Sequence, residues 1–77
     1  MAEEQKLQDF LDRLAETLEV PALALDDDFR SVPMWSSLAG FSVMVMFDLE
    51  YGKGLTAAEL QVARTVRDLA RKAGVVD

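Results

Sequence analysis

The sequence contains neither cysteine nor histidine. Without cysteine, the chain has no disulfide, no thiol nucleophile and no thiolate for a metal ion. Without histidine, it lacks the side chain that most often moves protons near neutral pH and that commonly binds zinc. For a chain of 77 residues, these two absences argue against an enzyme and against a metal centre, and we expect neither.

Positive charge is also scarce. The chain has 8 lysines and arginines but 14 aspartates and glutamates, which gives a net charge of −6. An acidic chain is repelled by the phosphates of nucleic acids, so we expect no nucleic-acid partner. The arginines at 64, 67 and 71 do form a basic row. A small nucleic-acid-binding helical domain that uses this row is the weakest of three interpretations of the sequence.

Long apolar runs are missing too. The longest, residues 43–47, is far too short to cross a bilayer, and the acidic start Met1-Ala2-Glu3-Glu4 has no apolar run behind it, unlike a signal peptide. We therefore expect a cytoplasmic protein without a membrane span. The length predicts a single domain over residues 1–77, and a hydrophobic fraction of 51% is sufficient for a core.

The periodicity of apolar residues and the helix-capping residues predict four helices and no strand. Their expected ranges are residues 3–19, 36 or 37 to 51, 57–63 and 66–73. Pro21 is expected to end the first helix, because a residue before proline is disfavoured in helical geometry. Gly52 and Gly74 are suitable residues to follow the second and fourth helices.

The start of the third helix is the best defined, because two independent signals agree there. Thr56 and Glu59 have the spacing of a capping box, and Leu55 and Leu60 that of a hydrophobic staple. Residues 21–35 form a long first loop, for which Phe29 is the expected anchor. The acidic run in this loop lacks the spacing of a calcium-binding loop. The prediction is an all-α four-helix bundle with a long first loop and a short third helix.

Two adjacent serines stand where the second helix is expected to begin. If Ser36 is the N-cap, its oxygen accepts a hydrogen bond from the amide of Leu38 or Ala39. Ser37 is then the first helical residue, with its hydroxyl free toward solvent. Free amides and the helix dipole favour an anion at such a place, so Ser37 is a candidate for modification through a phosphate. On local sequence alone, the interpretation that both serines are ordinary capping residues is favoured, because serine is common before a helix.

The chain resembles the acyl carrier proteins over nearly its whole length. This family has an Asp-Ser-Leu motif at the start of its second helix, and Ser36-Ser37-Leu38 stands in that place, preceded by Trp35. Other matches are Phe29, eight residues before Ser37, and two short motifs. These motifs are Glu50-Tyr51-Gly52 at the end of the second helix and Thr65-Val66-Arg67-Asp68-Leu69 at the start of the fourth.

The resemblance implies a fold of acyl-carrier type and a 4′-phosphopantetheine arm attached covalently to Ser37. Such a phosphoprotein carries acyl groups as thioesters for fatty acid, polyketide or aryl-polyene synthesis. Its partners would be a phosphopantetheinyl transferase, a ketosynthase and other acyl-processing enzymes, and the chain would be a monomer or bound to a partner enzyme. The alternative is a carrier-like protein–protein interaction module without the prosthetic group.

The sequence departs from the family pattern in two ways. Ser36 replaces the aspartate that helps the modifying synthase, and the acidic row of the second helix is largely replaced by apolar residues. We therefore expect an apolar partner face. The expected members of this face are Leu38, Val45, Met46 and Leu49.

The same helix is expected to contribute to a cleft for the acyl cargo. The predicted lining is Phe41, Met44, Phe47, Leu55, Leu60 and Ala63. Phe41 and Phe47 are bulkier than the residues common in the family, so we expect a small or closed cleft. A glycine inside a helix usually has a packing reason, and we expect the indole of Trp35 to lie against Gly40.

Overall fold

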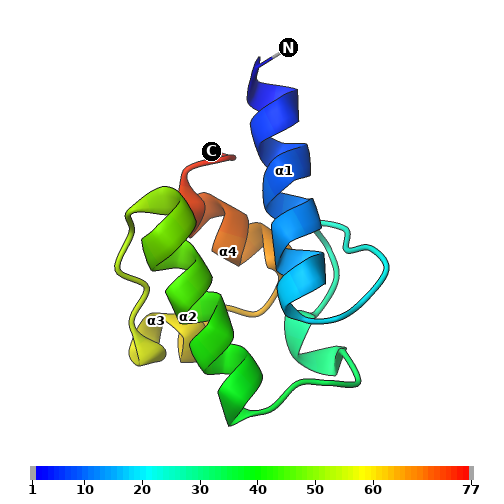
Figure 1. Ribbon diagram of the computed structural model, residues 1–77, viewed down its shortest axis with the longest axis vertical. Helices are drawn as coiled ribbons and strands as arrows, with labels where there is room; N and C mark the ends of the chain where they lie inside the picture. The colour runs from blue at the N-terminus through cyan, green and yellow to red at the C-terminus, as the bar shows by residue number, and fades with distance from the viewer. Residues whose placement is uncertain (1, 77) are drawn as a thin grey trace.

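The computed structural model describes residues 2–76, which form an all-helical chain without a strand in that range. The elements, in chain order, are α1 (Ala2–Thr17), a 3-10 turn η1 (Phe29–Ser31), α2 (Ser37–Tyr51), α3 (Ala57–Val62) and α4 (Val66–Ala73) (Figure 1). The prediction of four helices with a short third one is confirmed. Within the same residues, no helix is both long and apolar enough to cross a membrane.

The end of α1 differs from the prediction. The helix ends at Thr17 rather than at residue 19, because Glu19 takes a left-handed conformation with φ of 58°. The amide of Val20 then donates to the Ala15 carbonyl at 3.0 Å, which satisfies one of the free carbonyls at the helix end. Helix α1 has therefore already ended before the chain reaches Pro21.

The other helix ends follow the capping residues. Gly52 and Gly74 have φ of 61° and 79°, which only glycine adopts readily. At the start of α3, the Glu59 amide donates to the Thr56 hydroxyl and the Thr56 amide donates to the Glu59 carboxylate, both at 3.0 Å. At the start of α4, the Asp68 carboxylate accepts from the amide of Thr65. These caps explain why the predicted ends of α2, α3 and α4 lie within one residue of the observed ones.

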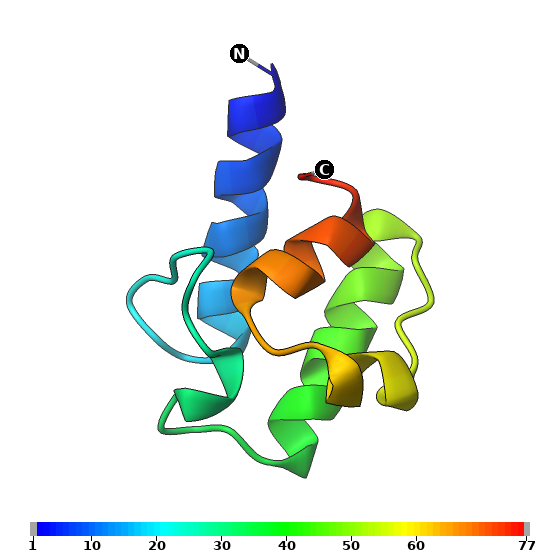
Figure 2. The ribbon, with the colours of Figure 1, turned by 180° about the vertical axis from the view of Figure 1, so that it is seen from behind.

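The core lies among the four helices and the first loop. In both ribbon views α1 and α2 are the long elements, while α4 lies against them and α3 crosses near the first half of α2 (Figures 1 and 2). The side chains with no exposed surface are Phe10, Leu14, Leu18, Phe29, Val43, Phe47, Val66, Leu69 and Ala70. In α4 the buried residues are Val66, Leu69, Ala70 and Ala73. The rings of Phe10 and Phe47 meet edge to face, with centroids 5.9 Å apart.

The first loop is held by the anchor that the sequence predicts. Phe29 is fully buried and meets the ring of Trp35 edge to face, with centroids 5.4 Å apart. The loop also supplies backbone acceptors to α4. The amides of Val66 and Arg67 donate at 2.9 Å to the carbonyls of Asp27 and Leu25. Two amides that a helix start leaves free are thus satisfied by the loop.

The three consecutive aspartates of this loop have separate partners. Asp26 pairs with Arg67 at 2.9 Å, Asp27 accepts from the Ala24 amide, and Asp28 accepts from the Arg30 amide at the start of η1. No cluster of three potential metal ligands occurs among the described residues. The acidic run therefore organises the loop through two local hydrogen bonds and one ion pair that joins it to α4.

Gly40 of α2 lies under the indole ring, as predicted. A Cβ atom at this position would be 3.6 Å from Trp35 Cη2 and only 3.3 Å from Leu60 Cδ2. We expect Gly40→Val to destabilise the domain by about 1–3 kcal/mol, because a branched side chain would push these two groups apart. Urea unfolding measures this loss. Gly54→Val is the control, since nothing lies within 4 Å of a Cβ at Gly54, and an equal loss in both variants would contradict the packing explanation.

The capping box of α3 predicts how stability depends on pH. Hydrogen bonds from Lys72 and Thr56 lower the pKa of Glu59 from 4.5 to about 2. Because the folded state holds this carboxyl ionised, its contribution is present above about pH 4.5 and is lost as the pH falls toward 2. We expect Glu59→Ala to be less stable than the wild type at pH 7 and the two to converge near pH 2. Urea unfolding across this range tests it, and a difference that does not vary with pH would contradict it.

Candidate modification site and the surfaces beside it

The two serines at the start of α2 divide their roles as predicted. Ser36 is the N-cap, and its hydroxyl accepts a hydrogen bond from the Ala39 amide at 3.2 Å. Ser37 is the first residue of α2 and is exposed. Its hydroxyl makes no hydrogen bond within residues 2–76. The capping requirement is therefore met without Ser37, whose hydroxyl remains available to an external reagent.

The backbone around Ser37 suits an anion. The amides of Ser37 and Leu38 make no hydrogen bond to any described residue, while those of Ala39 and Gly40 are taken by Ser36. Two donors therefore remain at the positive end of the α2 dipole. A phosphate on the Ser37 oxygen would lie beside them.

A shallow pocket of about 290 Å³ adjoins the two serines. Its lining is Arg30, Trp35, Ser36, Ser37, Gly40, Phe41, Met44, Ala57, Leu60 and Gln61. Three of the six predicted cleft residues, Phe41, Met44 and Leu60, belong to this lining. The pocket therefore places the exposed Ser37 hydroxyl next to an apolar surface between α2 and α3.

The other three predicted cleft residues lie elsewhere. Phe47 and Leu55 line a second hollow at the far end of α2, and Ala63 lines a third between α3 and α4. All three are buried, and Phe47 has no exposed surface. The predicted set is thus divided, because these side chains fill the core rather than one continuous cleft.

Arg30 is a residue of this site that the sequence does not predict. Its guanidinium donates to the carbonyls of Leu60 and Gln61, both at 2.7 Å, and lies 4.9 Å from the centre of the Phe29 ring. It therefore joins η1 to the last turn of α3, at the edge of the pocket beside Ser37. No motif signals this role, because the two ends of the contact are about thirty residues apart in the sequence.

The outward side of α2 carries a row of exposed apolar residues, which we call the apolar stripe. Its members are Leu38, Phe41, Val45 and Leu49, which are 73%, 59%, 38% and 74% exposed. Their spacing places them on one helical face. Leu38, Val45 and Leu49 are predicted members of the partner face, whereas Phe41 is predicted to line the cleft and in fact lies on both surfaces.

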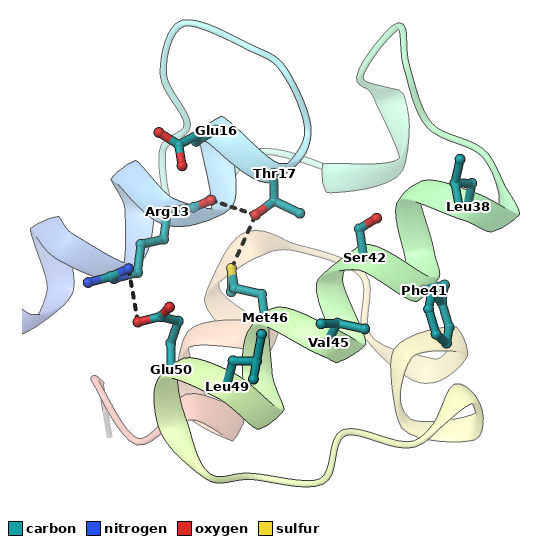
Figure 3. Close-up of a pocket in the computed structure, with 10 residues that line it drawn as sticks. All are labelled: Arg13, Glu16, Thr17, Leu38, Phe41, Ser42, Val45, Met46, Leu49 and Glu50. Carbon is teal, nitrogen blue, oxygen red and sulfur yellow. Dashed lines mark hydrogen bonds and ion pairs between the residues drawn. The ribbon is translucent and has the colours of Figure 1, made fainter.

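Met46 is the predicted face residue that the structure corrects. It is only 7% exposed, because its position in α2 faces α1 rather than solvent. The Thr17 hydroxyl, which donates to the Arg13 carbonyl at 2.8 Å, lies 3.5 Å from the Met46 sulfur (Figure 3). The Met46 side chain is therefore buried between α1 and α2 and does not belong to the apolar stripe.

The apolar stripe borders a groove of about 520 Å³ between α1 and α2 (Figure 3). Its polar wall comes from Arg13, Glu16 and Thr17 of α1, and Glu50 closes one end through an ion pair with Arg13 at 2.9 Å. Glu16 makes no ion pair within the described part of the chain. The groove thus has an apolar side and an uncompensated acidic side chain.

No family model, curated protein or solved structure matches this chain.

Proposed function

We propose that this chain is an acyl carrier protein and that the Ser37 hydroxyl is the attachment point of a 4′-phosphopantetheine arm. The main support is the division of roles at the start of α2. Ser36 caps the helix, so that Ser37, one residue later, is exposed and has no hydrogen-bond partner among residues 2–76. The fold of acyl-carrier type, a location in the cytoplasm and the absence of catalysis by the chain itself are parts of the same proposal.

The residues present fit such a group. A phosphodiester on the Ser37 oxygen would have the free amides of Ser37 and Leu38 beside it. The neighbouring pocket offers Phe41, Met44 and Leu60 to the apolar part of an arm or its cargo. When attached, the arm supplies the thiol that a chain without cysteine lacks.

In this proposal the chain's own task is to present one hydroxyl. A transferase removes the proton of Ser37, whose oxygen then bonds to the phosphorus that bears the pantetheine in coenzyme A. The pyrophosphate bond breaks and adenosine 3′,5′-bisphosphate leaves. The capped first turn of α2 holds the serine in place during this transfer, so ordering it costs little additional entropy.

The specific alternative is an interaction module that carries no arm. It is favoured by Ser36 in place of the family's aspartate and by the apolar stripe, since neither feature is needed for carrying a thioester. In that case, α2 serves only to bind a partner protein.

The intact mass of the protein after incubation with coenzyme A and a promiscuous phosphopantetheinyl transferase distinguishes the two functions. We expect the mass to rise by one phosphopantetheine group. A known carrier protein in the same reaction shows that the transferase is active. If that carrier is modified and this chain is not, even with prolonged incubation, the carrier proposal is wrong.

A further inference from the structure

The apolar stripe holds four of the large hydrophobic side chains that the described residues leave exposed. Leu38 and Leu49 are each nearly three-quarters exposed, and Phe41 is more than half exposed. The three lie on one face of α2, next to the groove that separates α2 from α1 (Figure 3). A continuous apolar patch of this kind typically marks an interaction site rather than isolated surface residues.

The charges beside the stripe that have no ion-pair partner among the described residues are negative. Glu16 on α1 and Asp48 on α2 make no ion pair within residues 2–76, and Met46, which faces α1, and Asp48 fall on opposite sides of the stripe in a helical projection. The single base of the groove, Arg13, is already paired with Glu50. The stripe is therefore flanked by uncompensated negative charge on both sides.

The length of the apolar stripe matches that of a short helix. The stripe extends from Leu38 to Leu49, which is about 16 Å along the axis at 1.5 Å per residue. About three turns of a partner helix have the same length and present apolar residues at matching intervals.

We propose that the α1–α2 groove binds an amphipathic helix of a partner protein, whose apolar row lies on the stripe and whose flanking residues are lysine or arginine. A second copy of this chain fits less well. Its own stripe is flanked by acids, and each copy carries a net charge of −6, so that like charges would meet. The proposal does not depend on the modification of Ser37.

Two synthetic helical peptides of about 18 residues test the surface. They share one apolar row and differ only in flanking residues, lysine in one and glutamate in the other. Fluorescence anisotropy with the unmodified full chain at low salt should show the lysine peptide binding at least about fivefold more tightly, because it pairs with Glu16 and Asp48. Leu49→Ser should weaken that binding by about tenfold.

Val62→Ser is the matched control, because Val62 is 79% exposed but belongs to α3. This variant should bind like the wild type. The proposal is overturned if the lysine peptide does not bind at about 1 mM, if both peptides bind equally, or if Leu49→Ser and Val62→Ser behave alike. It is also overturned if sedimentation shows a dimer that Leu49→Ser alone dissociates, since a second copy would then cover the stripe.

Because no prosthetic group takes part in this experiment, its failure leaves the mass measurement on Ser37 unaffected. Conversely, a chain that binds the lysine peptide but gains no mass would be the interaction module without an arm. The two outcomes can therefore be distinguished.

Discussion

Ser37→Ala should abolish the gain of one phosphopantetheine group that the wild-type chain shows with coenzyme A and a transferase. Alanine lacks the oxygen that forms the phosphodiester, so the expected loss is complete. The substitution should not disturb the fold, because the Ser37 hydroxyl makes no hydrogen bond within residues 2–76 and alanine is well tolerated in a helix. Intact mass spectrometry measures the modification, and circular dichroism verifies the helices.

Ser36→Ala is the matched control at the adjacent position. It removes the hydroxyl that accepts from the Ala39 amide, at a cost of about 1 kcal/mol in stability, but it should still be modified. Ser36→Asp keeps the cap and should be modified faster than the wild type, as the resemblance to carriers with Asp-Ser-Leu implies. If Ser37→Ala still gains the group, or if only Ser36→Ala loses it, the assignment of Ser37 is wrong.

Phe29→Ala should have the largest effect on stability among the substitutions considered, a loss of about 3–5 kcal/mol. The ring is fully buried, contacts Trp35 and lies beneath the Arg30 guanidinium. Its removal leaves a cavity where the first loop meets the core. Since small domains have a total stability of only about 5–15 kcal/mol, much of the chain should be unfolded in mild urea.

Phe41→Ala makes the same chemical change at an exposed position of α2. With 59% of its surface already in water, Phe41 should contribute no more than about 1 kcal/mol to stability. Urea unfolding of the two variants provides the comparison. Equal losses would show that Phe29 does not anchor the loop.

Most of the helix ends could be predicted from the sequence because they depend on local chemistry. The capping box of Thr56 and Glu59 and the left-handed Gly52 are each specified by one or two residue types. The end of α1 could not be predicted in this way. It depends on a left-handed Glu19, and no residue preference signals such a conformation in glutamate.

The role of each residue in α2 was harder to predict for a physical reason. An amphipathic helix shows its orientation through its polar face, but α2 is apolar on nearly every side and offers no such reference. This is why the sequence places Met46 on the outer face, although the residue is buried against Thr17. The contact of Arg30 with the α3 carbonyls likewise depends on tertiary structure alone.

If both proposals hold, the two surfaces of α2 would let the chain carry a group and bind a partner at the same time. Ser37 and its pocket lie on the α3 side of Phe41, and the groove lies on the α1 side. A helix bound in the groove would therefore leave the Ser37 hydroxyl accessible. Phe41 lines both the pocket and the groove.

Locating the prosthetic group within the modified chain is the most direct test of the account. After reaction with coenzyme A and a transferase, the protein is cleaved, and the peptide that contains residues 36 and 37 is fragmented in a mass spectrometer. We expect the added mass on Ser37 and on no other hydroxyl. Finding it on Ser36, Ser31 or Ser42, or finding no added mass while a known carrier is modified, would contradict the account.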